Sequence, residues 1–362
     1  MIAVVLVGGT GTRLRPLTLT VPKQVLPIVE VPMIERVLAY LETHGVDEAV
    51  LSLGYLHGAF QALFPDNRYG NVRLTYAVEP EPLDTAGAVG FAARHAGVSE
   101  RFLVVNGDVL TDLDITAMVA FHEARGAEAT ISLTLVEDPS AFGLVPTDDQ
   151  GKVVAFVEKP APGTVGPSYI NAGTYVLEPS VLDHIPAGER ISIERQVFPI
   201  LAAAGTVYGF TSDGYWTDTG TPSQYLQAQL DYVAGRHPGV PAPGARREES
   251  GVWAMDGADF GAGVAPPALI GAGAWVAADA SVANSVIGAR CRIHPGARVV
   301  ESVLMADVEI GKGAVVSRSI LGRAAGVGEG AEVAGLSVIG DGFLVEPGTH
   351  LDGARLPATE AP

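Results

Sequence analysis

Short aliphatic runs alternate with longer amphipathic segments over residues 2–235 of the chain. Five runs have the composition of buried strands, namely residues 2–8, 48–55, 72–79, 101–108 and 129–136. Residues 33–45 and 116–126 place apolar side chains at helical spacing. Strands that alternate with helices predict an α/β layer on a mainly parallel sheet, with ligands at the carboxyl ends of its strands.

A second pattern governs residues 268–356, where aliphatic residues recur in three columns with steps of 17, 17, 17 and 18 residues. The columns are Ile270, Ile287, Leu304, Leu321 and Ile339; Val276, Ile293, Ile310, Val327 and Val345; and Val282, Val299, Val316, Val333 and Leu351. Neighbouring columns lie six residues apart, so each coil has three faces with one inward aliphatic residue apiece. The spacing resembles the hexapeptide-repeat family and predicts a left-handed parallel β-helix.

A proline- and glycine-rich stretch separates the two patterns. It contains "RHPGVPAPGARREES" and has the composition of a linker. The predicted organisation is therefore an α/β domain at 1–235, a linker at 236–267, a β-helix at 268–356 and a tail at 357–362.

Composition narrows the class of function. The formal net charge of the 362 residues is −18, which argues against a nucleic-acid surface. Cys291 is the only cysteine, so an intramolecular disulfide framework and a multi-cysteine metal site are excluded. Neither an eighteen-residue apolar run nor a signal peptide is found, and we expect a cytoplasmic protein without a membrane segment.

The opening stretch "VVLVGGTGTRLRPLTLTVPK", residues 4–23, begins like a dinucleotide-binding turn. Leu14 stands where a Rossmann fingerprint needs its third glycine, and a Walker loop is absent. Pro16 and Pro22 instead favour an extended loop, in which glycine amides approach phosphate oxygens while Arg13 and Lys23 meet the remaining charge. Taken alone, the stretch fits equally well a strand-to-loop turn with two exposed cations.

Further motifs follow in order: "VNGDV" at 105–109, "FG" at 142–143, "FVEKP" at 156–160, "INAGTYVL" at 170–177 and "YWTDTGTP" at 215–222. Together with "GGTGTRLRPLTLTVPK", they resemble the sugar-1-phosphate nucleotidyltransferases, and most of all the mannose-1-phosphate guanylyltransferase branch. The resemblance covers the whole first domain and implies a Rossmann-like fold with a mainly parallel mixed sheet. A C-terminal β-helix is also a feature of that family.

The resemblance implies a reaction in which a sugar 1-phosphate attacks the α-phosphorus of a nucleoside triphosphate in line and pyrophosphate leaves. Such chemistry needs alignment and charge neutralisation more than a proton carrier. The implied catalytic residues are Arg13, Lys23, Asp108 and Asp218, and the two aspartates are the implied ligands of Mg²⁺. The implied nucleotide contacts are Leu6, Gly8, Gly9, Thr10, Gly11, Thr12, Glu79, Glu81, Asp84 and Thr85. The implied sugar-phosphate contacts are Gly143, Glu158, Lys159 and Asn171.

The stretch "AVEPEPLDTAGAV" at 77–89 resembles the base-reading loop of that family. Glu79 only accepts hydrogen bonds, so it complements the N1 and N2 donors of guanine and favours GTP. Two residues depart from the branch, because Asp84 replaces a glycine and Gln24 replaces a proline. The resemblance to that branch implies mannose 1-phosphate as the leading sugar substrate, and the two departures leave glucose 1-phosphate or a valienol-type cyclitol phosphate of secondary metabolism as an alternative.

Two other functions compete with this hypothesis. A regulatory paralogue that binds nucleotide sugar without catalysis should have lost part of the charged set, and this chain retains all of it. An acyl-transferring β-helix would need a histidine base, for which His294 and His350 are the candidates. His294 follows the inward Ile293 and is therefore expected to point outward. The β-helix is expected to pack on the catalytic domain or to build a homo-oligomer.

Overall fold

The computed structural model describes residues 1–54, 56–158 and 166–358. The chain forms two compact units, each assembled from separate segments. The first unit contains residues 1–9 and 34–216, and the second contains residues 10–33 and 217–362. Among the described residues, no helix has the length and apolarity needed to cross a membrane.

A mixed ten-stranded sheet forms the centre of the first unit. Its strands are β1 (Ile2–Leu6), β4 (Glu48–Leu53), β5 (Arg68–Tyr69), β6 (Val72–Val78), β7 (Phe102–Asn106), β9 (Ala129–Val136), β10 (Gly143–Leu144), β11 (Val157–Glu158), β12 (Ser168–Leu177) and β13 (Val207–Thr211). The central order β7-β1-β4-β6 is parallel, whereas β12 runs antiparallel to β7 and β9. The predicted α/β class with a mixed sheet is confirmed.

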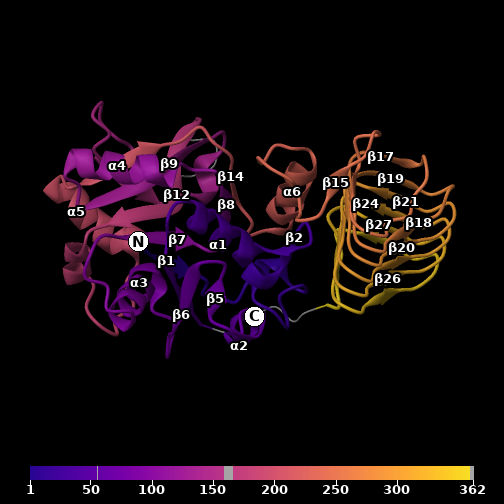
Figure 1. The fold of residues 1–362 in the computed structure, drawn as a ribbon, viewed down its shortest axis with the longest axis horizontal. Coiled ribbons are helices and arrows are strands. Elements are labelled where there is room, and N and C mark those ends of the chain that lie inside the picture. Colours follow the sequence, from indigo (N-terminus) through magenta and orange to yellow (C-terminus); the bar gives the residue numbers. More distant parts are fainter. Residues whose placement is uncertain (55, 159–165, 359–362) are drawn as a thin grey trace. The chain divides into compact units, whose positions relative to one another are not determined.

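Helices cover both faces of this sheet (Figure 1). They are α1 (Met33–Thr43), α2 (Gly58–Leu63), α3 (Asp84–His95), α4 (Ile115–Arg125) and α5 (Phe198–Ala204). Helix α3 contacts β1, β4 and β6, while α4 contacts β9, β12 and β13. Buried aliphatic and aromatic side chains of the strands and of α3 form one continuous core, so the strand ends that carry the site have a rigid support.

In the second unit, the opening segment packs with α6 (Pro222–Val233) and the β-helix. The segment contains the short helices η1 (Thr12–Leu14) and η2 (Lys23–Val25) and the strands β2 (Pro27–Ile28) and β3 (Val31–Pro32), which pair as a tight hairpin. Strand β14 (Trp216–Asp218) leads from the first unit into α6.

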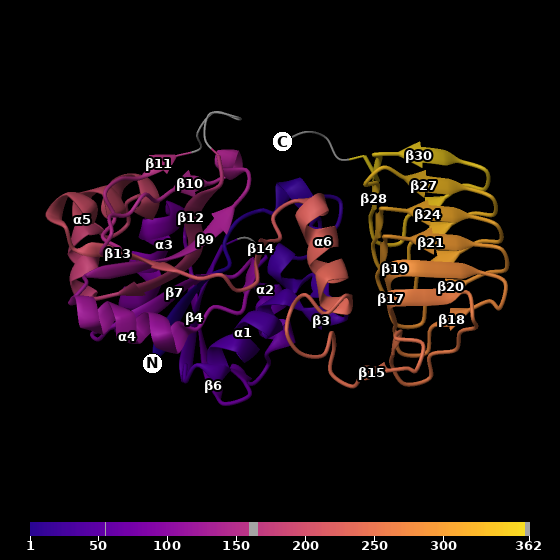
Figure 2. The ribbon, with the colours of Figure 1, turned by 90° about the horizontal axis from the view of Figure 1, so that it is seen from above.

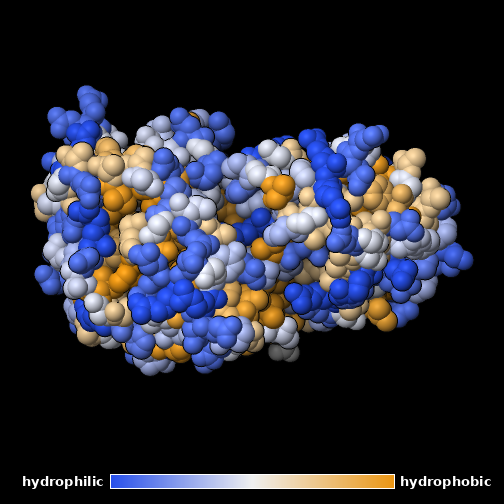
Figure 3. Space-filling view, viewed as in Figure 1, coloured by the Kyte–Doolittle hydropathy of each residue, from blue (hydrophilic) through white to orange (hydrophobic). Residues whose placement is uncertain are grey.

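Stacked strands build the β-helix (Figure 2), and they pair in parallel except that the first two run antiparallel to each other. They are β15 (Arg246–Arg247), β16 (Trp253–Ala254), β17 (Val264–Ile270), β18 (Trp275–Val276), β19 (Ser281–Ile287), β20 (Arg292–Ile293), β21 (Arg298–Val300), β22 (Val303–Leu304), β23 (Glu309–Ile310), β24 (Val315–Ser317), β25 (Ile320–Leu321), β26 (Gly326–Val327), β27 (Glu332–Ala334), β28 (Val338–Ile339), β29 (Leu344–Val345), β30 (His350–Asp352) and β31 (Arg355–Leu356). All three predicted aliphatic columns line its interior, and only Leu351 in the last coil is partly exposed. On the visible face in Figure 3, hydrophilic and hydrophobic residues are interspersed over the outside of the coils.

Strand pairing begins upstream of the predicted β-helix boundary at residue 268. Trp253 pairs in parallel with Leu269, and Ala254 pairs with Ile270. Val252 and Ala254 are buried, so this part of the predicted linker forms a coil of its own. The prediction failed here because the segment lacks the aliphatic columns. The boundary between the α/β domain and the linker at residue 235 stays a prediction.

Candidate functional site

The carboxyl ends of β1 and β7 lie side by side in the first unit. Leu6 pairs with Asn106, and the Gly107 amide donates to the Leu6 carbonyl oxygen at 2.9 Å. A Cβ on Gly107 would lie 2.6 Å from Val7 Cγ1, so only glycine fits between these strand ends. The close approach places the exposed Gly8 and Gly9 and the half-buried Asp108 at one edge of the sheet. The predicted convergence of these residues at strand ends is therefore observed.

Glu79 lies beside this edge, and its carboxylate is anchored by the protein. Oε1 accepts a hydrogen bond from Ser52 Oγ at 2.9 Å, and Oε2 accepts one from the Leu83 amide at 3.1 Å. A Cβ on Gly8 would lie 3.8 Å from Oε1, which places the carboxylate next to the glycine turn. Each carboxylate oxygen has a second lone pair for a ligand. Glu81 is exposed.

The first turn of α3 is tied to the segment 191–195. The Ile191 carbonyl accepts hydrogen bonds from the Ala86 and Gly87 amides. Thr85 Oγ1 donates to Glu194 Oε2 at 2.8 Å and accepts from the Ile193 amide at 2.8 Å. The Thr85 hydroxyl, which the motif resemblance assigns to nucleotide binding, thus links the start of α3 to the segment 191–195.

Asp84 stands at the start of α3 with a left-handed backbone, φ +61°. Its Oδ1 accepts from the Thr85 amide at 2.8 Å, and its Oδ2 pairs with Arg195 Nη2 at 3.1 Å. Glycine, which the related enzymes have at this position, adopts this left-handed conformation most easily. Aspartate can adopt it as well, because its side chain makes a local hydrogen bond to the backbone. The added carboxylate is directed to Arg195, across a pocket that both residues line.

This pocket of the first unit has a volume of about 480 Å³. Its lining is polar and aromatic: Asp84, Asn106, Ala141, Phe142, Gly143, Phe156, Val157, Asn171, Ser192, Glu194, Arg195 and Pro199. Convergent amides, carboxylates and one guanidinium suit a polar ligand with several hydroxyls. The Phe142 ring stacks edge-on against Trp216, with centroids 5.5 Å apart, which steadies one wall.

Strands β10, β11 and β12 bring the predicted sugar contacts together. Gly143 pairs with Glu158 across β10 and β11, and Leu144 pairs with Ile170, the residue before Asn171. Asn171 Nδ2 donates to the Tyr175 hydroxyl at 2.8 Å, and its Oδ1 accepts from the Gly173 amide at 3.0 Å. The Asn171 amide is thereby oriented. Lys159 lies outside the described residues.

A bulge in β12 shapes the floor of the pocket. The register with β9 shifts between Asn171 and Tyr175, and Gly173 has φ +79°. A Cβ at Gly173 would lie 2.5 Å from Asn106 Nδ2. Glycine is required there both for the backbone conformation and to leave room for the Asn106 side chain.

In the second unit, the opening loop places Arg13 beside Asp218. A Cβ on Gly220 would lie 2.5 Å from Arg13 Nη2 and 2.9 Å from Asp218 Oδ1. Gly220 leaves room for the guanidinium, and its amide donates to Asp218 Oδ1 at 2.7 Å. The structure therefore brings together two charged residues that the sequence places about two hundred positions apart.

The same loop is closed on itself around Gly11, which has φ +59°. Thr18 Oγ1 donates to the Gly11 carbonyl at 2.8 Å. A Cβ on Gly11 would lie 3.5 Å from Lys23 Cβ, so the lysine lies next to Gly11 where the loop closes. Thr10 and Thr12 are exposed on it. Gln24, which follows Lys23, is only 1% exposed.

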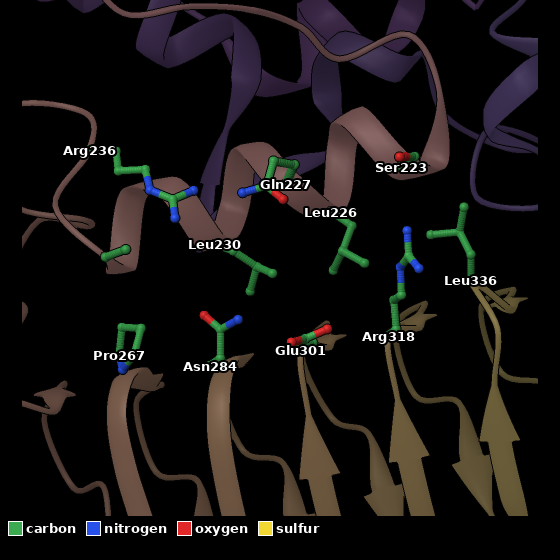
Figure 4. A pocket seen from close by; sticks show the side chains of 11 residues that line it. Ser223, Leu226, Gln227, Leu230, Arg236, Pro267, Asn284, Glu301, Arg318 and Leu336 are labelled. Atoms are coloured by element: carbon green, nitrogen blue, oxygen red, sulfur yellow. The ribbon is translucent and has the colours of Figure 1, made fainter.

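A further cavity of about 320 Å³ lies between α6 and a row of β-helix corners (Figure 4). Leu226, Leu230 and Gln227 extend from the helix toward Asn284, Glu301 and Arg318 on successive coils (Figure 4). None of these residues belongs to the motifs described above.

The candidate bases for acyl transfer are engaged on the outside of the coils. His294 Nε2 lies 2.8 Å from Glu309 Oε1, and His350 Nδ1 lies 3.1 Å from Glu332 Oε2. His294 is 30% exposed and His350 74%, as the inward position of Ile293 predicts for its neighbour.

Several pocket residues are not among the contacts predicted from the sequence, including the polar residues Asn106, Glu194 and Arg195. Asn106 precedes the glycine of "VNGDV", so its place at a strand end was an available signal. Glu194 and Arg195 lie in "SIERQVFPIL", residues 192–201, whose sequence is typical of a helix and carries none of the motifs quoted above. That segment begins as a π-helix, η5 (Ile193–Val197), and its first turn faces the pocket.

Comparison with known proteins agrees with this arrangement. Residues 2–235 match the family described as "Nucleotidyl transferase", and residues 264–359 match the "GMPPB C-terminal domain". The chain is 39% identical to the mannose-1-phosphate guanylyltransferase of Mycobacterium tuberculosis over 283 residues, which cover 77% of this chain and 76% of that protein. It is 40% identical to the probable mannose-1-phosphate guanylyltransferase 2 of Arabidopsis thaliana, over 67% of this chain and 69% of that protein.

Among solved structures, HddC from Yersinia pseudotuberculosis complexed with GMP-PN is similar, with a TM-score of 0.56 and 29% identity. That match covers 64% of this chain and 99% of the HddC chain. The match to the family, over residues 2–235, spans the opening loop, the strand ends and the pocket. The chain therefore belongs to the nucleotidyl transferase family and is a sugar-1-phosphate nucleotidyltransferase.

Proposed function

We propose that the protein joins GTP to mannose 1-phosphate, which gives GDP-mannose and pyrophosphate. The observation that carries the proposal is the similarity, at 39% identity over three quarters of each chain, to a protein named mannose-1-phosphate guanylyltransferase. The similar HddC structure is a complex with GMP-PN, a guanine-type ligand by its name, which supports the choice of base.

The roles of the residues follow the chemistry of in-line transfer. In our proposal, a phosphate oxygen of the sugar 1-phosphate forms a bond to the α-phosphorus while the bond to the β-phosphate oxygen breaks. Amides of the turn from Gly8 to Gly11 hold the triphosphate, and Arg13 and Lys23 neutralise the charge that accumulates on the departing pyrophosphate. Positioning and charge neutralisation supply most of the catalysis in such a reaction, so a general base is not required.

A divalent cation, which we take to be Mg²⁺, fits the donor groups present. Mg²⁺ is commonly bound through one or two carboxylates together with substrate phosphates. Asp108 and Asp218 would supply the carboxylates. Asp218 Oδ1 already accepts the Gly220 amide, which orients the carboxylate. A divalent cation held there would supply charge neutralisation on the phosphates during the transfer.

The pocket of the first unit is assigned to the sugar phosphate. Asn171, Glu194 and the Asp84–Arg195 pair offer acceptors and donors to sugar hydroxyls. Glu158 and Lys159 keep the roles that the motif implies, on the sugar and on its phosphate. Glu79 is assigned to the N1 and N2 donors of guanine, with its carboxylate oriented by Ser52 and Leu83.

The decisive experiment is a pyrophosphate-release assay with four nucleoside triphosphates against mannose, glucose and cyclitol 1-phosphates, with added Mg²⁺. We expect the highest kcat/KM for GTP with mannose 1-phosphate. Turnover with another triphosphate and none with GTP would contradict the assignment of the base. A preference for glucose 1-phosphate or a cyclitol phosphate would contradict the assignment of the sugar.

The role of Asp108 is tested by Asp108→Asn, which keeps the shape of the side chain and removes its charge. We expect loss of most activity with an unchanged melting temperature. The control is Asp149→Asn at an exposed aspartate. Full turnover of the Asp108→Asn enzyme would refute its role as a cation ligand.

We further infer a cytoplasmic homo-oligomer. The lone Cys291 is buried, and burial raises the pKa of its thiol to about 12, so this side chain is chemically inert and compatible with a reducing compartment. Light scattering of the purified protein measures the assembly directly, and a monomer would contradict this inference.

A further inference from the structure

The last strand of the β-helix binds the opening loop of the second unit. Arg355, in β31, donates from Nη1 to the backbone carbonyls of Arg13 at 2.8 Å and Arg15 at 3.1 Å. The partners are 342 and 340 residues apart in the chain. One guanidinium nitrogen thus fixes two peptide groups on either side of Leu14.

Two more contacts hold the loop against the coils. A Cβ on Gly340 would lie 3.1 Å from Pro16 Cβ, so the proline packs directly on the β-helix backbone. Further along, Glu30 Oε2 accepts a hydrogen bond from the Ala289 amide at 3.2 Å. The loop therefore touches the β-helix at an early coil, through Ala289, and at the last two coils, through Gly340 and Arg355.

Helix α6 holds the same loop from another side. Gln229 is 1% exposed, and its Oε1 accepts from the Val29 amide at 2.9 Å while its Nε2 donates to the Pro27 carbonyl at 3.0 Å. The Tyr225 hydroxyl donates to the same carbonyl. Residues 27–29 are thus fixed by a helix, whereas residues 13–16 are fixed by the β-helix.

The hydrogen bonds of Arg355 fix the backbone from which the Arg13 side chain extends. The Arg13 guanidinium lies beside Gly220 and Asp218, at the end of a long and flexible side chain. If the backbone of such a residue is already fixed, less conformational entropy is lost when the side chain binds a ligand. We propose that Arg355 is a positioning residue of the nucleotidyl transfer, through which the β-helix holds Arg13 ready for the triphosphate.

This inference rests on the proposed function only for the identity of the ligand that Arg13 meets. Its structural content is that the backbone of residues 13–15 is held by the guanidinium of Arg355. Arginine suits this role because its fork remains charged and planar while two carbonyls approach one nitrogen. A lysine can donate to both carbonyls with less directional control, and an alanine donates nothing.

The test compares Arg355→Ala and Arg355→Lys with the matched control Arg298→Ala, an exposed β-helix arginine on β21. Each protein is assayed with GTP varied at saturating mannose 1-phosphate and then with the sugar varied at saturating GTP. Hydrogen–deuterium exchange is followed for peptides that cover residues 10–26, and thermal melting reports the folded fraction.

We expect Arg355→Ala to lower kcat/KM for GTP by about tenfold, the loss that one or two hydrogen bonds carry. The KM for mannose 1-phosphate should change much less, and Arg355→Lys should recover part of the loss. Exchange in residues 10–26 should rise in the alanine variant and stay at the wild-type level in Arg298→Ala. If Arg355→Ala does not fold, the lysine variant provides the same comparison.

A merely structural role would lower the melting temperature and leave the kinetics of the folded enzyme unchanged, and that result would overturn the proposal. Unchanged exchange in residues 10–26 would overturn it as well, whatever the substrates are. A wild-type enzyme that is silent with GTP would instead refute the proposed function, and the exchange experiment would still decide the role of Arg355.

Discussion

Gln24 is a buried amide for which the described residues offer no hydrogen-bond partner. Its side chain is 1% exposed, and both Nε2 and Oε1 are unpaired among them. An unsatisfied polar group in the protein interior costs about 1–3 kcal/mol. We therefore predict that Gln24→Met, which keeps the length of the side chain, raises the free energy of unfolding by roughly 1 kcal/mol.

Gln229 is the matched control for this substitution, because it is equally buried and hydrogen-bonded at both ends of its amide. Gln229→Met should destabilise the protein, since it removes two buried hydrogen bonds, from the Val29 amide and to the Pro27 carbonyl. Urea unfolding of the two variants measures both effects. Destabilisation by Gln24→Met of the same size as by Gln229→Met would show that the Gln24 amide does have partners.

Asp84 occupies a left-handed position, φ +61°, that favours glycine. Its pair with Arg195, which is 63% exposed, is expected to contribute only about 0–1 kcal/mol. We predict that Asp84→Gly is more stable than Asp84→Ala by about 1 kcal/mol, the reverse of the usual order at a helical position. Urea unfolding of the two variants tests this, and equal stability would mean that the backbone here relaxes.

The departures at Asp84 and Gln24 could be predicted from the sequence, but their consequences could not. The carboxylate of Asp84 meets Arg195 across 111 residues of chain, and the pairing depends on how η5 follows β12 and the segment 178–192. The burial of Gln24 likewise depends on packing within the second unit. A motif identifies which residues are unusual, whereas only tertiary contacts show what each one touches.

At the scale of elements, the β2–β3 hairpin places a carboxylate against a β-helix corner. Val29 and Glu30 form its tip, both with positive φ, and Glu30 accepts the Ala289 amide. Burial raises the pKa of Glu30 above its usual value, although the Ala289 hydrogen bond and Arg290 oppose this effect. At neutral pH the hairpin therefore bears the cost of a partly desolvated charge.

A carboxyl group whose pKa is raised on folding stabilises the protein fully below its unfolded pKa, and that contribution is lost as pH rises through the folded pKa. We predict that Glu30→Gln, whose carbonyl can still accept the Ala289 amide, has a higher melting temperature than the wild type at about pH 8. The difference should disappear toward about pH 4. Melting curves across this range measure it, with Glu329→Gln as an exposed control. A pH-independent difference would contradict the titration of Glu30.

The β-helix coils were predictable because the pattern that encodes them repeats. The same step also places Ser285, Ser302 and Ser319 in a buried column. There the Ser302 amide donates to Ser285 Oγ and the Ser319 amide donates to Ser302 Oγ, each at 3.1 Å. The serines lie 17 residues apart, as the aliphatic columns do, so their spacing was visible in the sequence. The prediction did not include them because it considered aliphatic residues only. The coil at Trp253 was missed because it carries no repeat.

At the scale of the whole chain, the compact units do not follow the order of the sequence. Residues 10–33 belong to the unit that contains the β-helix, although "GGTGTRLRPLTLTVPK" starts in the other unit. The sequence motifs predicted one continuous domain for residues 1–235. Such motifs identify residues with a chemical role, but they do not indicate which segments of the chain pack together. The contacts of Arg355 and Glu30, at separations of 342 and 259 residues, leave no local signal.

The β-helix supports the opening loop of this chain directly. The carbonyls of Arg13 and Arg15 and the ring of Pro16 have partners there.

We predict that a chain ended after Gly235 loses at least as much kcat/KM for GTP as Arg355→Ala, about tenfold or more, because all three β-helix contacts of the loop are removed together. Removal would also uncover Leu226 and Leu230 of α6, which are 4% and 7% exposed in the full chain, so the fragment should aggregate more readily. Size-exclusion chromatography and the pyrophosphate-release assay on the fragment and the full chain measure both effects. A monodisperse fragment with the kcat/KM of the full chain would show that the β-helix is not needed to hold residues 10–33.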